Sequence, residues 1–529
     1  MALATTHAVA LLGIDGAVIE IEAHVGAGLP AFSLVGLPDA SLSEARDRVR
    51  AAVVNSRQPF PQHRLTVGLS PAMLPKAGAH YDLAIAVAVL AAAGVVPRER
   101  LDGVVLLGEL GLDGRVRSVR GVLPLALAAS AAGWQRLIVP AENAAEAALV
   151  EGVSVLGVRT LAQCVAALRG DGPPDDDPPC RLDGGGTLPP PMPGETGSRE
   201  DEVDLADVLG QAEARLAIEV AAAGGHHVFL CGPPGAGKTM LAERLPGLLP
   251  DLDLGSALEV SAIHSVAGLL PAGQPLVRRP PFVDPHHTAS VAAIVGGGSR
   301  VARPGAISLA HRGILFLDEA PEFHPAALDA LRQPLESGEV VIARAGFTAR
   351  YPAAFQLVMA ANPCPCGQSG GLGATCTCAP YARARYRQRL SGPIRDRIDI
   401  TKVVAPVSRA EMLADRTRVE SSSQVAGRVF AARARQRERF AGCRWSVNAA
   451  IPASQLRSRH APEPAGLRLV DRAVAAGRLS ARGADRVLRL AWTLCDLAGR
   501  TDRPTADDCA VGLTLRLGDA GDATRERVG

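Results

Sequence analysis

The chain has 529 residues, of which 47% are hydrophobic and 21% charged, and its formal net charge is only +2. A soluble chain of this length exceeds what one hydrophobic core supports, so we expect two or three domains. The near-neutral balance excludes a global field that would draw the chain to nucleic acid or to anionic membrane, and any such binding needs local patches.

The N-terminal segment does not resemble a secretory leader. Residues 1–30 carry no basic cluster, and Asp15, Glu20 and Glu22 interrupt their apolar stretch. The longest nearly uncharged run, residues 83–97, is shorter than the roughly 20 residues that a membrane-spanning helix needs. We therefore expect a soluble, cytoplasmic protein with no membrane partner.

The first 170 residues are predicted to form a mixed α/β domain. Ile19, Ile21, Ala23 and Val25 alternate with polar residues, which is typical of a half-buried strand. Residues 41–54 and 82–93 show helical patterning instead. This mixture of periods predicts strands and helices within one α/β unit.

A linker is predicted over residues 171–200, where 14 of 30 residues are proline or glycine. Such a composition does not support a packed core. The linker separates the first domain from a predicted catalytic core with a parallel sheet over residues 201–405. A helical domain over residues 406–518 and a tail over residues 519–529 complete the expected organisation.

A phosphate-binding loop follows the linker, between a predicted strand at residues 226–231 and a helical run at residues 240–249. Glycines allow successive backbone N–H groups to converge on phosphate oxygens, and the helix N-terminus adds its positive end. Lys238 is predicted to bridge the β- and γ-phosphates of ATP, and the Thr239 hydroxyl to ligate Mg²⁺. The complete nucleotide-binding loop is Gly232, Pro233, Pro234, Gly235, Ala236, Gly237, Lys238 and Thr239.

Two further strand ends supply the polar groups that such a loop requires. The apolar run at residues 313–317 ends in Asp318 and Glu319. We expect Asp318 to hold Mg²⁺ through water and Glu319 to orient and deprotonate the attacking water. A third strand, residues 356–361, ends at Asn362, which could sense the γ-phosphate. Taken alone, acids at a strand end are commonly just solvated, and an asparagine before proline is usually a turn residue.

Four of the ten cysteines cluster in one short segment, which suggests metal chemistry more than a disulfide framework. Two pairs with one residue inside each pair could supply the four thiolates of a structural Zn²⁺. The usual spacing inside a pair is two residues, so a loop of reduced thiols is the alternative. The cysteines are Cys364, Cys366, Cys376 and Cys378.

Two arginine-dense segments could contact nucleic acid. The first holds Arg383, Arg385, Arg387 and Arg389 beside Tyr381 and Tyr386, and the second holds Arg433, Arg435, Arg437 and Arg439 in a helical context. Arginine with interleaved aromatic residues can follow a phosphate backbone and stack on bases. A solvated or intersubunit face is about as plausible for each. The hairpin at residues 340–351, with its turn at Ala345 and Gly346, could point Arg344 and Arg350 toward a pore or serve as scaffold.

Several stretches resemble one family. PFVDPHHTAS at residues 281–290, RPGAISLAHRGILFLDE at 303–319, AANPCPCG at 360–367 and SGPIRDRIDI at 391–400 are similar to the magnesium-chelatase-like AAA+ proteins known as YifB or ComM. The resemblance runs from the first residues to about residue 517. It implies an ATPase that assembles into a ring, usually a hexamer, with a helical lid at the C-terminus. It also implies an arginine finger at Arg397, acting on the neighbouring subunit, and a second sensor arginine at Arg482, acting in cis.

The first domain resembles the proteolytic domain of Lon proteases over residues 74–82, 113–121 and 137–143. In those proteases a serine attacks the peptide bond and a lysine takes its proton. Here His80 holds the place of the serine and Leu123, as we align it, that of the lysine. We therefore expect an inactive scaffold that organises the ring or contacts DNA, and the role of Lys76 stays open.

The family resemblance favours a motor that drives branch migration of DNA in homologous recombination or natural transformation. A magnesium-chelatase-type ATPase subunit and an ATP-driven protein remodeller are the alternatives. The sequence has no recognisable integrin-like metal-binding domain, which weakens the chelatase alternative without excluding a partner subunit. Branched or single-stranded DNA and further copies of this chain are the expected partners; the polarity, the ring size and the loading partner stay open.

Overall fold

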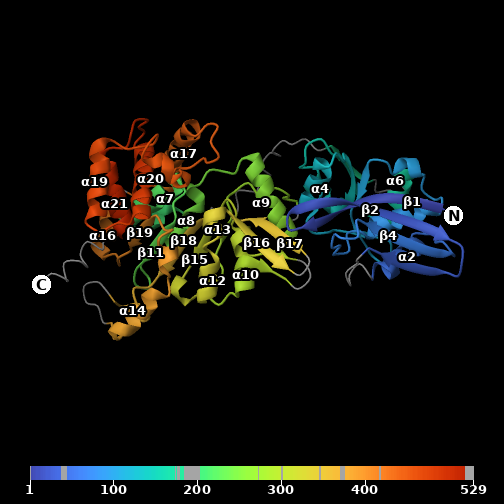
Figure 1. Ribbon diagram of the computed structural model, residues 1–529, viewed down its shortest axis with the longest axis horizontal. Coiled ribbons are helices and arrows are strands. Elements are labelled where there is room, and N and C mark those ends of the chain that lie inside the picture. Colours follow the sequence, from blue (N-terminus) through green and yellow to red (C-terminus); the bar gives the residue numbers. More distant parts are fainter. Residues whose placement is uncertain are drawn as a thin grey trace.

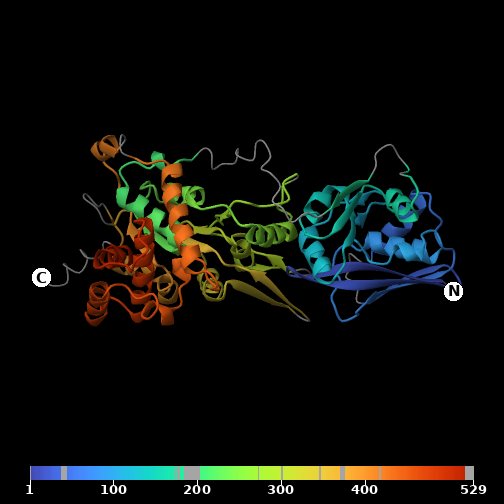
Figure 2. The same cartoon turned by 90° about the horizontal axis from the view of Figure 1, so that it is seen from above.

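The computed structural model describes residues 2–36, 44–172, 174, 179–183, 203–271, 273–298, 302–344, 347–369, 376–415 and 419–518. Figures 1 and 2 show three bodies in a row: an N-terminal domain at one end, a central sheet domain, and a helical C-terminal domain at the other end. The molecule is therefore elongated, with the central domain contacting both neighbours.

The N-terminal domain is built on an eight-stranded mixed sheet with the order β10-β9-β8-β5-β1-β2-β4-β3. In β2 the side chains of Ile19, Ile21 and Ala23 are fully buried while Glu20 is exposed, so the alternation predicted from the sequence is confirmed. The strands are β1 (Ala2–Leu12), β2 (Asp15–Gly26), β3 (Ala31–Val35), β4 (Arg64–Ser70), β5 (Val104–Leu106), β8 (Arg136–Pro140), β9 (Ser154–Val158) and β10 (Cys180–Asp183), with a separate pair β6 (Glu109–Leu110) and β7 (Val116–Arg117).

Helices cover this sheet. The two helical segments expected at residues 41–54 and 82–93 correspond to α2 (Ala45–Asn55) and α3 (Asp82–Ala92), although residues 41–43 lie outside the described part. Every residue of α3 is buried, because the helix packs between β1, β2 and α2. The remaining helices are α4 (Val122–Ala131), α5 (Ala144–Ala147) and α6 (Leu161–Arg169).

The sheet extends into the segment that composition assigned to the linker. Cys180–Asp183 pair antiparallel with β9 as the edge strand β10. Four residues of alternating polarity are enough to add an edge strand, which needs a partner on one side only. The proline and glycine run at residues 184–200 lies outside the described residues.

The central domain contains a five-stranded sheet with the order β12-β15-β18-β11-β19, in which every pairing is parallel. All residues of β15 and β18 are buried, as expected for parallel strands covered on both faces. Strands β11, β15 and β18 all end at the same edge of the sheet. The strands are β11 (Val228–Cys231), β12 (Phe282–Val283), β15 (Ile314–Leu317), β18 (Gln356–Ala361) and β19 (Ile400–Val403).

Helices and two hairpins surround the central sheet. The helix after the phosphate-binding loop begins at Lys238 and ends at Arg244, where Pro246 starts a 3₁₀ turn, so it is shorter than the run predicted at residues 240–249. The helices are α7 (Ala212–Gly224), α8 (Lys238–Arg244), α9 (Leu254–Ala267), α10 (Val291–Val295), α11 (Ala306–Leu309), α12 (Pro325–Ala330), α13 (Pro334–Ser337), α14 (Pro380–Gln388) and α15 (Gly392–Arg395). The hairpins are β13 (Gly296–Gly297) with β14 (Arg303–Pro304), and β16 (Glu339–Arg344) with β17 (Phe347–Pro352).

The N-terminal domain is attached to the central domain through helix α9. Ala257 and Ala262 of α9 belong to the hydrophobic core of the N-terminal domain. The Ser265 hydroxyl donates to the buried carboxylate of Glu146, which also accepts the backbone N–H of Leu123 at 2.9 Å. In addition, Gly13 at the turn between β1 and β2 pairs with Arg350 of β17. Arg350 also forms an ion pair with Glu339 within the hairpin, and the turn at residues 345–346 lies outside the described residues.

The C-terminal domain is helical, as expected, and its own core gathers around α20. Val425, Val429 and Leu490 also join the core of the central domain, so the two domains share packing. The helices are α16 (Arg409–Asp415), α17 (Ser422–Arg439), α18 (Ala453–Leu456), α19 (Pro464–Ala475), α20 (Ala481–Leu497) and α21 (Ala506–Leu517). Among the described residues, none of the helices combines the length and apolar character that crossing a bilayer requires.

Candidate nucleotide site

The phosphate-binding loop leaves β11 and enters α8 with a backbone that only glycine adopts readily. Gly235 and Gly237 have φ of +76° and +88°. A side chain at Gly232 would meet the Val404 carbonyl oxygen at 2.2 Å. The glycines therefore serve the loop's conformation and its close packing on the segment after β19.

The Lys238 ammonium is folded back onto the loop. It donates to the carbonyl oxygens of Gly232 and Pro233 at 2.8 and 2.9 Å and to Asn362 Oδ1 at 3.2 Å. Burial lowers the pKa of Lys238, and the negative charges of Asp318 and Glu319 oppose this shift. The acceptors that hold the Lys238 ammonium are all neutral. Phosphate oxygens are charged and form stronger hydrogen bonds, so they would replace these acceptors.

Thr239 and Asp318 meet across the sheet edge. The Thr239 hydroxyl donates to Asp318 Oδ2 at 2.8 Å, and Asp318 Oδ1 accepts the backbone N–H of Glu319 at 2.8 Å. A hydroxyl beside a carboxylate is a hard-oxygen pair of the kind that binds Mg²⁺. The two residues predicted to share the metal are therefore neighbours in the fold.

Glu319 stands in a left-handed backbone conformation, with φ of +49°. This conformation is costly for a non-glycine residue and is found preferentially at functional sites. Its side chain is half exposed, and Glu319 Oε2 lies 3.5 Å from His287 Nδ1. His287 follows β12, which pairs with β15, and it was missed because nothing local in the sequence connects it to Glu319.

Asn362 is placed at the end of β18 beside Lys238, and the chain after it packs on the loop. The backbone of Asn362 hydrogen-bonds Tyr386 of α14, a buried residue whose pKa is raised to about 12 mainly by that burial. Gly367 touches Pro234, where a Cβ would lie 2.6 Å from the proline Cδ. The structure thus brings together Lys238, Thr239, Asp318, Glu319 and Asn362.

Comparison with known proteins shows the family of the chain. Models of the magnesium chelatase subunit ChlI, of a further ChlI region and of the ChlI C-terminal region match residues 204–412, 21–143 and 419–516. An uncharacterised Mycobacterium tuberculosis protein is 52% identical over 98% of this chain and 99% of its own length. The uncharacterised protein YifB of Escherichia coli is 41% identical, and the competence protein ComM of Haemophilus influenzae 39% identical, each over 94% of both chains. The chain belongs to the YifB/ComM family of magnesium-chelatase-like AAA+ proteins.

Within this YifB/ComM chain, one of the two arginines implied by the family has partners other than the loop, and the other has an exposed side chain. Arg397 follows α15, and its guanidinium donates to the Pro393 carbonyl oxygen at 2.6 Å and pairs with Glu336. Arg482 is the second residue of α20, and its side chain is exposed. Neither arginine joins the hydrogen bonds that connect the loop, Asp318 and Asn362 in the described residues. Their proposed roles therefore need a neighbouring subunit or a bound nucleotide.

The four cysteines come together after Asn362. Cys364 Sγ lies 3.3 Å from Cys366 Sγ and 3.6 Å from Cys376 Sγ, and all four sulfur atoms lie within 4.8 Å of one another. All four thiols are free, because these separations far exceed a disulfide bond of about 2.05 Å. The cluster could hold a metal ion; residues 370–375, which join the two pairs, lie outside the described residues.

The two arginine-dense segments differ in the burial and partners of their side chains. In α17, Arg433 donates to the Ala222 carbonyl oxygen, Arg435 to that of Asp496, and Arg439 pairs with Asp496 while lying 4.1 Å from the Trp492 ring centroid. Arg433, Arg435 and Arg439 therefore hold α17 against α7 and α20, and only Arg437 of these four arginines presents an exposed side chain.

Helix α14 presents a different surface. Tyr381 is 77% exposed, and Arg385 is exposed one turn later on the same face. Tyr386, which the sequence offered as a second stacking ring, is instead buried against Asn362. Arg389 donates to the Pro321 carbonyl oxygen at 3.1 Å and to Glu322 at 2.9 Å. One face of α14 is thus anchored at the nucleotide site, and the other is basic and open.

The structure places Lys76, His80 and Leu123, the residues that the sequence analysis compared with a protease site, in contacts of the N-terminal fold. Lys76 is buried and donates to the Gly36 carbonyl oxygen at 3.2 Å and to that of Pro71, while Leu123 is fully buried in the core. His80 Nε2 lies 3.0 Å from the Val9 carbonyl oxygen. His80 also lines a cavity of about 490 Å³ at the junction with the central domain, together with Ser118, Arg120 and Arg303.

Proposed function

We propose that this protein is an ATP-hydrolysing ring motor that remodels branched DNA. Residues 232–239 would hold the phosphates, Thr239 and Asp318 the Mg²⁺, and Glu319 would orient the attacking water. Bound ATP and Mg²⁺ would supply the phosphoryl group and neutralise its charge. The support for these roles is the convergence of the residues at one sheet edge and the membership of the family.

Ring assembly is part of the proposal. Arg397 would act in trans on the nucleotide of a neighbouring subunit, and Arg482 would contact the nucleotide in cis. Neither arginine joins the hydrogen bonds of the loop in the described residues of the single chain. A homo-oligomer, with six subunits as the expected number, would bring Arg397 to a neighbour's site in the cytoplasm.

The DNA assignment depends on the two faces of helix α14, one open and one in contact with the nucleotide site. Its open face holds Tyr381 and Arg385, an aromatic ring for base stacking and a cation for a phosphate. Its other face touches Asn362 through Tyr386 and Glu322 through Arg389. These contacts would connect a change at the nucleotide site to the helix that would bind DNA.

A structural Zn²⁺ at the four cysteines would complete this surface. Four thiolates around Zn²⁺ at about 2.3 Å would be about 3.8 Å apart in a tetrahedron. The separations of 3.3 and 3.6 Å around Cys364 are close to that value. Because Gly367 packs on Pro234, such an ion would stiffen the connection between the phosphate-binding loop and α14.

The test is ATP hydrolysis with four-way junction DNA compared with linear duplex of the same length. We expect stronger stimulation by the junction, and its loss in Tyr381→Ala/Arg385→Ala. The matched control is Phe430→Ala/Arg437→Ala, which removes an exposed aromatic ring and an exposed arginine from α17. DNA-independent hydrolysis would contradict the proposal and favour a chelatase-type or protein-remodelling ATPase.

A further inference from the structure

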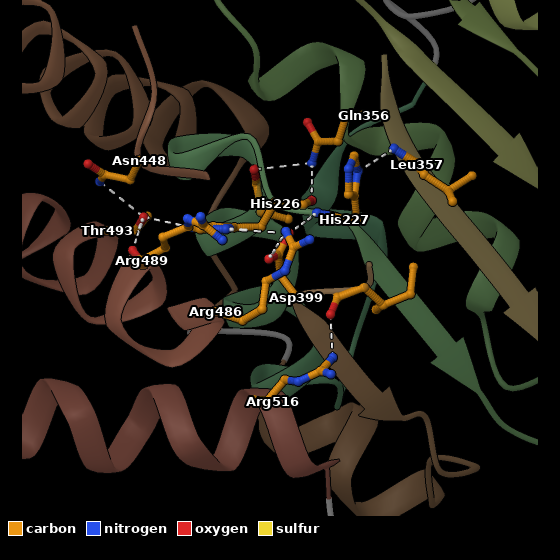
Figure 3. A network of polar contacts seen from close by, with 12 residues as sticks. His226, His227, Gln356, Leu357, Asp399, Asn448, Arg486, Arg489, Thr493 and Arg516 are labelled. Carbon is orange, nitrogen blue, oxygen red and sulfur yellow. Dashed lines mark hydrogen bonds and ion pairs between the residues drawn. The ribbon is translucent and has the colours of Figure 1, made fainter. Parts of the chain in front are cut away.

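A buried polar network joins the central domain to the C-terminal helices, on the side of the sheet where β11 and β19 begin (Figure 3). Its centre is Asp399, whose side chain is fully buried. Asp399 Oδ2 accepts the backbone N–H of His227 at 2.9 Å, and Oδ1 accepts Arg486 Nη1 at 2.8 Å. The carboxylate therefore belongs to the central domain and its main cation to helix α20.

Asp399 is two residues from Arg397 along the chain. Residues 396–399 lead from α15 through a turn into β19, so Arg397 and Asp399 share one short connection. Arg516 of α21 donates to the backbone carbonyl oxygen of Ile398, the residue between them. Two C-terminal helices thus hold the segment that carries Arg397.

On the lid side, Arg486 lies one helical turn after Arg482 on α20. The proposed cis sensor and the cation that grips Asp399 are therefore on the same rigid helix, on neighbouring turns. A rotation of α20 that follows nucleotide contact at Arg482 would have to move Arg486 with it.

The network around this pair is closely packed. Burial alone would raise the pKa of Asp399, but Arg486 and His226 more than offset it and hold the pKa below its usual range. His226 Nε2 lies 2.8 Å from the Thr493 hydroxyl of α20, and Gln356 donates to the His226 carbonyl oxygen at 2.8 Å. A carboxylate buried in this way is costly without its partner, so the segment cannot release Arg486 and keep its conformation.

We propose that Arg486 is a positioning residue for the arginine finger: through Asp399, the position of a subunit's own lid sets the position of its Arg397 in the neighbour's nucleotide site. The inference rests on the proposed trans role of Arg397. It adds a route by which a nucleotide sensed in one subunit controls hydrolysis in the next. Arg397 is suited to such control, because its Nε is buried with no hydrogen-bond partner in the described structure.

The experiment uses mixed rings of two full-length variants. Glu319→Gln subunits keep Arg397 but lack the catalytic carboxylate, so they act as donors of the finger. Arg397→Ala subunits keep Glu319 but lack the finger, so they act as acceptors. Hydrolysis in the mixture then comes from acceptor sites that border a donor.

Arg486→Met is introduced into either the donor or the acceptor. We expect a loss of at least about tenfold in mixed-ring hydrolysis when the donor carries it, because a finger contributes several powers of ten to the rate. In the acceptor we expect a change of less than about threefold. An equal or larger loss in the acceptor would overturn the proposal, since Arg486 would then act in cis or on folding in general. An inactive unmodified mixture at every ratio would instead refute the trans role of Arg397, and this inference with it.

A second readout needs no nucleotide. Amide hydrogen exchange at residues 397–400 should accelerate in Arg486→Met and recover in part in Arg486→Lys, which keeps the charge. The matched control is Arg428→Met, which removes another ion pair between the lid and the central domain, to Glu219 of α7 at 2.7 Å. Unchanged exchange in Arg486→Met would contradict the proposal that Arg486 fixes the segment carrying Arg397. An equal rise in Arg428→Met would contradict it as well, since the effect would not be specific to Arg486.

Discussion

Gly367 packs directly against Pro234, so closely that a Cβ on the glycine would stand 2.6 Å from the proline ring. Gly367 follows Cys366, and Pro234 belongs to the phosphate-binding loop. The cysteine cluster and the nucleotide site are therefore one structural unit. A group that stiffens the first also constrains the second.

We predict that the purified full-length chain holds about one Zn²⁺ per chain, measured by elemental analysis after dialysis under reducing conditions. Cys376→Ser/Cys378→Ser should lose the metal and become more sensitive to protease near residues 364–378. Cys443→Ser, at a free cysteine of the C-terminal domain, is the control and should keep it. Protein without stoichiometric zinc would remove the proposed site.

Lys238→Ala should abolish ATP binding, whereas Glu319→Gln should bind ATP and stop hydrolysing it. The first loses the cation that faces the phosphates, and the second loses the base for the attacking water. Calorimetric binding and steady-state hydrolysis separate the two effects. Met240→Ala, at an exposed position of α8, should behave like the wild type. Robust turnover by Glu319→Gln would show that another group is the base.

His287→Ala should raise the basal rate of ATP hydrolysis without DNA. His287 Nδ1 lies 3.5 Å from Glu319 Oε2, so the imidazole competes with water for the carboxylate. A partly exposed pair of this kind contributes about 1 kcal/mol or less, which corresponds to a change of up to about fivefold. His286→Ala, whose ring contacts Thr288, should leave the rate unchanged. A large loss of hydrolysis in His287→Ala would mean that the histidine assists Glu319.

The N-terminal domain should show no peptidase activity. Leu123, which our alignment matches to the protease lysine, is buried in the core, and His80 lies against the Val9 carbonyl oxygen. Incubation of the pure protein with an unfolded substrate and ATP should therefore leave the substrate intact. ATP-dependent degradation that His80→Ala abolishes would place the chain among the proteases.

The nucleotide site could be predicted from the sequence because its parts are local. A strand followed by the glycine loop and Lys238 fixes one element of the site, and Asp318 and Asn362 each directly follow a buried strand. Parallel strands end at one edge of a sheet, so these side chains meet without any long-range information.

The other contacts could not be predicted, because they depend on packing between segments that are far apart in the sequence. His287 reaches Glu319 because β12 pairs with β15, and Arg486 reaches Asp399 because α20 packs on the central sheet. The arginine content of α17 is the same as that of a nucleic-acid-binding patch. The use of these arginines in holding backbone carbonyls, as Arg433 does with Ala222 of α7, follows from tertiary contacts that the spacing does not encode.

The central claim, an ATP-driven remodeller of branched DNA, is tested most directly by dissociation of a labelled four-way junction with long homologous arms. We predict that the wild-type protein converts the junction to duplex products when ATP and Mg²⁺ are present, and that Glu319→Gln binds the junction without converting it. Tyr381→Ala/Arg385→Ala should hydrolyse ATP but fail to respond to the junction. Wild-type protein that hydrolyses ATP and leaves the junction intact would contradict the account.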